Sequence, residues 1–121
     1  MVQGAKSIRT FIGARNYEES REFYQLLGFD EVIIDPKMSY FSVDPKLGFY
    51  LQDYYVKGWV DNSMIFLEVE DIEAHHARIE AKNLPDQFPK VRLSSIKNLD
   101  WGREFFLHDP SGVLWHVGCF N

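Results

Sequence analysis

The chain has little cysteine, no long apolar run and no excess of basic residues. Its single cysteine, Cys119, excludes an intrachain disulfide and is typical of a protein from a reducing compartment. No stretch reaches the ~18–20 apolar residues that cross a bilayer, and Met1 to Lys6 do not resemble the apolar part of a signal peptide. We therefore expect a cytoplasmic protein that does not bind membranes.

The charge and the length of the chain exclude further classes of protein. Lysine and arginine number 13 against 18 aspartate and glutamate residues, so the net charge is −5 and the basic stripe typical of nucleic-acid binding is missing. With 121 residues, the chain is long enough for one domain with its own core. Aromatic residues are plentiful, with ten Phe, six Tyr and three Trp. The composition predicts one soluble domain that does not bind nucleic acids.

The residue pattern repeats along the chain. Residues 7–15 and 63–70 alternate as strands do, and a helix is expected after each. The helix N-caps are Asn16 and Asp71, 55 positions apart, and Gly28 and Asn83 suit the positions just after the helices, again 55 apart. Three short strands are expected after each helix, at residues 30–35, 39–43 and 48–54 and at residues 90–96, 103–108 and 113–120.

Such a duplication predicts an α+β fold. We expect two tandem βαβββ-type repeats that form curved mixed sheets around a cup-shaped cleft, with the helices outside. The halves are placed at about residues 7–60 and 61–121. Because neither half has enough apolar surface to be stable alone, residues 1–121 are taken as a single domain.

Three segments carry motifs that occur together in a known fold. In the first helix, Phe23-Tyr24 is followed after a short spacer by Leu27-Gly28-Phe29, and residues 66–74 form a strand-to-helix junction. Near the end, Trp101-Gly102-Arg103-Glu104-Phe105 precedes Asp109-Pro110-Ser111-Gly112. In this order they resemble the vicinal oxygen chelate superfamily (glyoxalase, bleomycin resistance protein and extradiol dioxygenase), and most closely its bleomycin-resistance branch.

The resemblance implies positions for a divalent metal, because the enzymes of this superfamily hold one in the cup. Those positions fall on Arg9, Met64 and His116, and a fourth falls on either Tyr50 or Gln52. An arginine repels a cation, a thioether is a poor ligand for magnesium or zinc, and a catalytic zinc takes three protein ligands. We therefore expect no metal and no other cofactor.

Alternation also places a mainly aromatic set of side chains on the strand faces opposite the expected core residues Ile8, Ile12, Ile65, Leu67 and Val69. We expect this set to line a small-molecule pocket, with Trp101 at the rim. Phe, Tyr and Trp rings suit planar or cationic ligands. The expected ligand-binding residues are Arg9, Phe11, Tyr50, Gln52, Tyr54, Met64, Phe66, Glu68, Trp101 and His116.

One charge in this set has two possible partners. Arg9 either forms an ion pair with Glu68 or binds an anionic group of the ligand. We favour the ion pair, since a buried unpaired guanidinium is costly.

These features favour a metal-free small-molecule binding protein that sequesters an aromatic or cationic compound, as in antibiotic resistance. The resemblance implies a homodimer, because many members complete their cups with two chains. The alternative is a glyoxalase-like lyase or isomerase in which Glu68 or Glu104 is the general base and His116 assists, with or without a divalent metal. A third possibility is a structural domain in which the aromatic side chains fill the cup as core.

Overall fold

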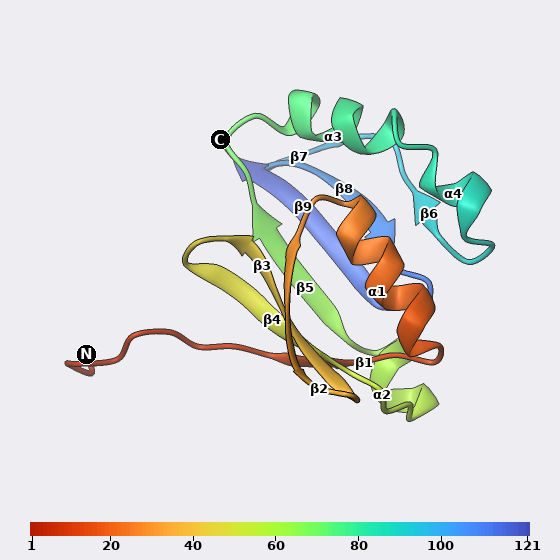
Figure 1. Ribbon diagram of the computed structural model, residues 1–121. Coiled ribbons are helices and arrows are strands. Elements are labelled where there is room, and N and C mark those ends of the chain that lie inside the picture. Colours follow the sequence, from red (N-terminus) through yellow and green to blue (C-terminus); the bar gives the residue numbers. More distant parts are fainter.

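The computed structural model describes all 121 residues and contains nine strands and four helices (Figure 1). The first half forms sheet A, in which the strands lie in the order β1-β4-β3-β2. Helix α1 connects β1 to β2, and the short helix α2 leads into the second half. The elements are β1 (Phe11–Gly13), α1 (Tyr17–Leu26), β2 (Asp30–Asp35), β3 (Met38–Asp44), β4 (Leu47–Gln52) and α2 (Lys57–Asp61).

The second half forms sheet B, with the order β5-β9-β8-β6 and β7 paired to β8. Helices α3 and α4 follow β5 and precede the remaining strands. The elements are β5 (Met64–Glu68), α3 (Ile72–Glu80), α4 (Leu84–Gln87), β6 (Arg92–Leu93), β7 (Lys97–Leu99), β8 (Gly102–His108) and β9 (Leu114–Phe120). None of the four helices is long and apolar enough to cross a membrane.

The two sheets repeat one topology, which confirms the predicted α+β duplication. In sheet A, β1 runs parallel to β4 and Phe11 lies opposite Tyr50. In sheet B, β5 runs parallel to β9 and Phe66 lies opposite His116. Phe11 and Phe66 are again 55 positions apart, so the sequence repeat corresponds to equivalent places in the two sheets.

The helix ends confirm the predicted caps. Asn16 Oδ1 accepts the backbone N–H of Glu19 at 3.1 Å, and Asp71 Oδ1 accepts that of Ala74 at 3.0 Å. Past the helices, Gly28 has a φ of 99° and Asn83 a φ of 53°. Such left-handed conformations end helices, and glycine or asparagine adopts them most readily.

Two predicted strands are shorter than expected. The strand at residues 7–15 is reduced to β1, and Ile8 is 98% exposed on the arm Met1–Thr10, because no other element covers it. Its expected place in the core is therefore wrong. The strand at residues 90–96 is reduced to β6, because the Ser94 hydroxyl accepts the backbone N–H of Phe106 and replaces a carbonyl in the ladder. Helices α2 and α4 and strand β7 were not predicted.

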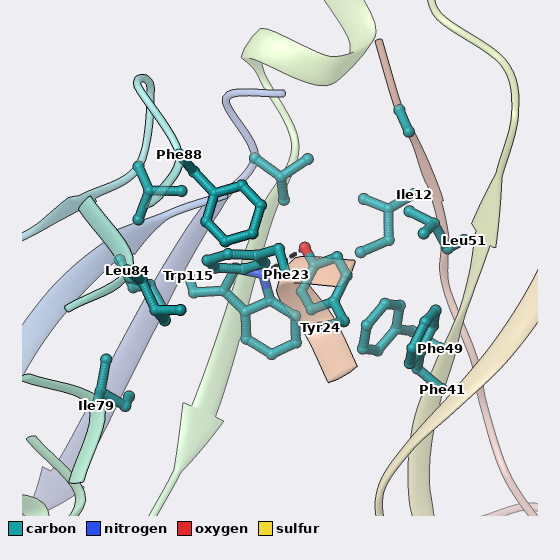
Figure 2. Packing of buried hydrophobic residues seen from close by; sticks show 14 of the residues in the cluster. Ile12, Phe23, Tyr24, Phe41, Phe49, Leu51, Ile79, Leu84, Phe88 and Trp115 are labelled. Atoms are coloured by element: carbon teal, nitrogen blue, oxygen red, sulfur yellow. Dashed lines mark hydrogen bonds between the residues drawn. The ribbon is translucent and has the colours of Figure 1, made fainter. Parts of the chain in front are cut away.

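The core lies between the two sheets, around α1 (Figure 2). Phe23 and Tyr24 of α1 are fully buried, and the Tyr24 ring contacts Phe49 of sheet A and Trp115 of sheet B. Each sheet therefore uses one face for the core. We call the opposite faces the open faces: that of sheet A carries Phe11, Tyr40, Tyr50 and Gln52, and that of sheet B carries Met64, Phe66, Glu68, Glu104, His116 and Phe120.

A buried turn at Asp109 ties α1 to sheet B. Asp109 Oδ1 accepts the backbone N–H groups of the residues two, three and four positions ahead, each at 2.9 Å. Tyr24 donates its hydroxyl hydrogen to Asp109 Oδ2 at 2.7 Å and accepts the indole N–H of Trp115 at 3.0 Å. Burial raises the pKa of Asp109, although these hydrogen bonds oppose the rise, and burial also raises the pKa of Tyr24.

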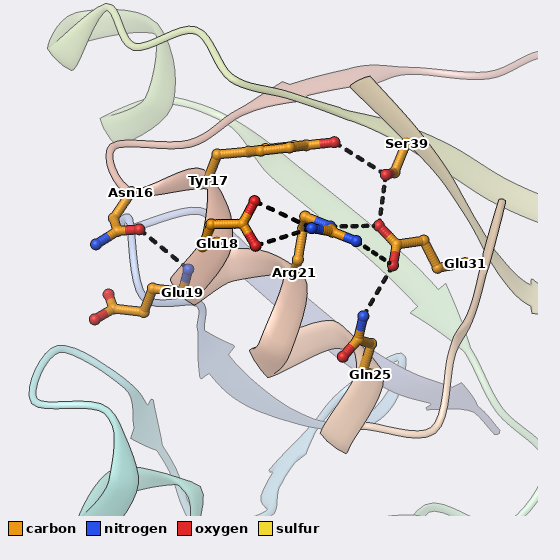
Figure 3. Close-up of polar contacts among 8 residues, drawn as sticks. All are labelled: Asn16, Tyr17, Glu18, Glu19, Arg21, Gln25, Glu31 and Ser39. Atoms are coloured by element: carbon orange, nitrogen blue, oxygen red, sulfur yellow. Dashed lines mark hydrogen bonds and ion pairs between the residues drawn. The ribbon is translucent and has the colours of Figure 1, made fainter. Parts of the chain in front are cut away.

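A second polar network ties α1 to sheet A (Figure 3). Arg21 Nε lies 2.6 Å from Glu31 Oε2, and Arg21 Nη1 lies 2.8 Å from Glu18 Oε2. Ser39 and Gln25 also donate hydrogen bonds to the Glu31 carboxylate. Burial alone would raise the pKa of Glu31, but the hydrogen bonds from Arg21, Ser39 and Gln25 together hold it below its ordinary value.

Candidate functional site

The predicted ligand-binding residues form two groups, one on each open face, instead of one cup within the chain. No hydrogen bond, ion pair or ring contact joins the groups. The two groups also line different clefts. Phe66 and Glu68 line one cleft, and Phe11, Gln52 and Tyr54 line another. The helices pack on the core faces, so both groups face away from α1 and α3. Each group is thus half of the expected site.

On the open face of sheet A, Arg9 lies among tyrosines. Its Nη1 donates to the Tyr50 hydroxyl at 3.0 Å, and its guanidinium carbon lies 4.4 Å from the centre of the Tyr40 ring. The hydrogen bond to Tyr50 raises the pKa of Arg9. Phe11 stacks on the other side of this cluster, with its ring centre 4.7 Å from that of Tyr50. The expected ion pair between Arg9 and Glu68 is wrong, because Glu68 belongs to the open face of the other sheet.

On the open face of sheet B, a carboxylate orients the histidine. His116 Nδ1 lies 2.9 Å from Glu104 Oε1, and His116 Nε2 lies 3.5 Å from the sulfur of Met64. Glu104 is buried, and the imidazole of His116 is partly exposed on the open face. A hydrogen bond from Nδ1 to the carboxylate leaves Nε2 of the neutral ring as an acceptor. With this nitrogen, which lies beside the Met64 sulfur, and the exposed carboxylate of Glu68, the face presents two polar groups to a ligand.

Three exposed aromatic rings form a cluster beside this histidine, and two rings contact it: Phe66 of that cluster, with its ring centre 6.4 Å from the imidazole, and Phe106, at 5.1 Å. Phe66 contacts Trp101 and Phe120, with ring centres 6.0 Å and 5.7 Å away, and Trp101 contacts Phe120 at 5.2 Å. Between 38% and 54% of each residue is exposed. The Phe66 ring lies over Gly118, where an added Cβ would come within 2.7 Å of its Cζ. The glycine thus lets the ring lie flat on β9.

The register relates the positions of the metal site that the resemblance implies in the two halves. Tyr50 lies opposite Phe11 as His116 lies opposite Phe66, so Tyr50 is the structural equivalent of His116 in sheet A. Arg9 contacts Tyr50 in one half, and Met64 contacts His116 in the other.

This donor set does not fit a divalent metal. His116 alone is an ordinary ligand, and Arg9 is a fixed cation. No group of three or more His, Cys, Asp or Glu residues in the structure is arranged to hold a metal ion.

The largest cleft, of about 970 Å³, runs along the seam between the two halves. The exposed arm forms one of its walls and the edge of β5 another, and charged side chains of both signs line it. Only two of the predicted residues, Phe66 and Glu68, lie in it. We therefore place the candidate site on the open faces.

Sequence reasoning missed three aromatic residues of these faces, Tyr40, Phe106 and Phe120, and a fourth, Trp59, beside the face of sheet A. The first three could have been found, because they alternate with the core residues of predicted strands. Trp59 is 67% exposed on α2, a helix of five residues, and lines a cleft of about 240 Å³ with Phe11 and Tyr54. Its only signal in the sequence is the density of aromatic residues after β4.

A scan against protein-family models and a search of curated proteins both found no match. Solved structures do match. A bleomycin-binding protein from bleomycin-producing Streptomyces verticillus, complexed with copper(II)-bleomycin, has a TM-score of 0.81 at 19% identity over 100% of both chains. An antibiotic-binding protein from a Streptomyces species has a TM-score of 0.76 at 18% identity, again over 100% of both chains.

A third match is a glyoxalase/bleomycin resistance protein from Catenulispora acidiphila. Its TM-score is 0.76 at 14% identity, over 97% of this chain and 100% of that one. At such identities the likeness concerns the backbone. This chain therefore has the fold of these bleomycin-binding and glyoxalase/bleomycin resistance proteins, as the resemblance in the sequence predicted.

Proposed function

We propose that this protein binds a small aromatic or cationic molecule without the help of a metal. The observation that carries the proposal is the exposed cluster of Phe66, Trp101 and Phe120, in which Phe66 also contacts His116. Large rings gathered on an exposed face mark a binding surface more often than chance exposure does. Such rings hold planar or cationic groups, and His116 Nε2 adds one hydrogen-bond acceptor to fix the orientation.

The structural neighbours support this class of function. Several of them are bleomycin-binding or antibiotic-binding proteins. We propose that this chain likewise sequesters a small compound of that kind in the cytoplasm.

We also propose that a second copy completes the site. Each open face bears half of the predicted residues, and β1 and β5 are edge strands with one unpaired side. The arm Met1–Thr10 adds an exposed Ile8. A homodimer that brings the open face of sheet A from one copy to the open face of sheet B from the other would enclose the ligand between them.

Titration calorimetry and thermal shift with a ligand panel test the proposal. The panel contains bleomycin with and without copper and other planar or cationic antibiotics. Phe66→Ala and Trp101→Ala are expected to weaken binding about fivefold or more, since each removes a ring contact worth about 1 kcal/mol or more. Leu26→Ala, on the exposed end of α1, serves as the control and should bind as the wild type does.

Two results would contradict the proposal. One is that no compound of the panel binds; the other is that both ring variants bind as tightly as the control. Native mass spectrometry reports the number of chains together with any carried-over ligand. A monomer that binds ligand with full affinity would rule out completion of the site by a second copy.

The alternative, an enzyme that transfers protons, is favoured by one observation. Glu104 orients the imidazole of His116, as a carboxylate does for a catalytic histidine. In this arrangement His116 is the base and Glu104 positions it, whereas Glu68 is exposed and makes no hydrogen bond to either. A glyoxalase-type assay with His116→Ala as control tests this function. Elemental analysis that found stoichiometric nickel, zinc, manganese or iron would contradict the metal-free proposal.

A further inference from the structure

A small cavity lies where α2 meets the open face of sheet A. Its volume is about 240 Å³, and its walls include Phe11 of β1, Gln52 of β4, Tyr54, Trp59 of α2 and Ser63. Sites for whole drug-sized ligands measure roughly 300 to 1,000 Å³. This cavity is smaller, so it suits one chemical group of a ligand.

The backbone brings α2 close to β1. The carbonyl oxygen of Tyr54 accepts the backbone N–H of Ala14 at 3.0 Å, and a Cβ on Gly13 would collide with that carbonyl. Val60 is buried and anchors α2 in the core. Trp59, one residue earlier, therefore points outward and forms the outer wall of the cavity.

Three exposed rings define the chemistry of the cavity. Phe11, Tyr54 and Trp59 are each more than half exposed, and the ring centres of Tyr54 and Trp59 lie 6.0 Å apart. The cavity has no charged lining residue. The nearby cations are engaged elsewhere: Arg9 binds Tyr50, and Lys57 pairs with Asp61 at 2.8 Å. One face of Phe11 is covered by Tyr50, and no protein cation lies over the rings of Tyr54 and Trp59, which can receive a cation from outside.

We propose that this aromatic cavity binds an alkylated ammonium group of the ligand. The proposal rests on the proposed function, since it assigns the cationic part of the ligand to one end of the sheet A face. Rings attract a cation within about 6 Å of their centres, most strongly when water is displaced, and a methylated ammonium sheds water easily. Gln52 and Ser63 supply neutral polar atoms for a neighbouring hydroxyl or amide of the same ligand.

Choline and its neutral isostere 3,3-dimethylbutan-1-ol test the proposal. They have nearly the same shape and differ in charge, so the comparison isolates the attraction between cation and ring. We expect choline to bind about tenfold or more tightly than the alcohol, as measured by NMR shifts of the Trp59 indole on titration. Equal affinities, or no binding of choline, would overturn the proposal.

Substitutions test whether choline binds in this cavity. Trp59→Ala should weaken choline binding about tenfold or more, and Trp59→Phe should restore part of it. Tyr55→Ala is the matched control, because Tyr55 lies in the same segment but does not line the cavity. Urea unfolding verifies that Trp59→Ala remains folded, as expected for an exposed side chain. Choline binding that survives Trp59→Ala, read from the backbone amides, would overturn the assignment.

The test is separate from that of the proposed function. If the antibiotic panel binds but choline does not, the cavity assignment fails and the binding function stands. If choline binds and the whole panel does not, the cavity assignment stands, and the part of the proposed function that names an antibiotic-like ligand fails.

Discussion

Two equivalent turns of the molecule share a local design but differ in burial. Asp44 begins the turn between β3 and β4, and Asp109 begins the turn between β8 and β9; a proline follows each. In both turns Oδ1 accepts the backbone N–H groups of the residues two and three positions ahead, at 2.7 to 2.9 Å. Asp44 is exposed, whereas Asp109 is fully buried and also binds Tyr24.

The difference shows how one local pattern acquires two energetic roles. In water the Asp44 turn only shapes a hairpin, because solvent can replace its hydrogen bonds. Inside the core the Asp109 carboxylate is the acceptor for buried donors of both halves, and nothing else can satisfy them. The buried turn therefore holds the two sheets together, which the exposed turn cannot do.

The largest predicted effect comes from Asp109→Ala. It leaves the backbone N–H groups of Ser111 and Val113 and the Tyr24 hydroxyl without an acceptor in the core, whereas the N–H of Gly112 keeps the backbone carbonyl of Asp109. We expect a loss of more than about 3 kcal/mol in the free energy of unfolding, measured by urea denaturation. Asp44→Ala, the matched change, should cost less than about 1 kcal/mol. Similar losses for the two variants would refute the role given to burial.

A smaller, pH-dependent effect is expected from Glu31→Gln. Hydrogen bonds hold the folded-state pKa of Glu31 below its ordinary value of 4.5, so its stabilising contribution is complete above that pH and is lost as the pH falls through the folded-state pKa. At pH 7 the variant should be less stable by about 1–3 kcal/mol, because hydrogen bonds to a charge are lost.

The difference in the free energy of unfolding between wild type and Glu31→Gln should become smaller as the pH falls below 4.5. Urea unfolding at a series of pH values measures it. Asp109 makes the opposite contribution: burial raises its pKa above 3.8, so its contribution to stability decreases as the pH rises from there through the folded-state pKa. A difference that did not change with pH would contradict the assignment to Glu31.

The smallest effect on stability is expected from Gly118→Ala on the open face of sheet B. The new methyl group would lie 2.7 Å from the Phe66 ring, which must tilt away from β9. Because the ring is exposed at its far end, the loss should be about 1 kcal/mol or less. Ligand affinity should fall, since the aromatic cluster loses its arrangement. Gly48→Ala, the comparison in sheet A, also meets the backbone carbonyl of Phe41 and should cost more stability.

The sequence predicted the features that depend on neighbours along the chain. The caps Asn16 and Asp71 and the 55-residue repeat were predicted from the sequence, because a few adjacent residues determine each of them. Strict alternation also separated core positions from the residues of the open faces. This was enough for the fold, which the structural neighbours share.

Contacts between side chains that lie far apart in the sequence could not be predicted in this way. Only the tertiary structure placed Arg9 with Tyr40 and Tyr50, oriented His116 by Glu104 and divided the expected cup between two faces. Periodicity assigns each side chain to a face of its own strand, but it carries no information on which sheets meet or where a five-residue helix folds back. Those contacts join residues far apart in the sequence, so the packing of the whole chain decides them.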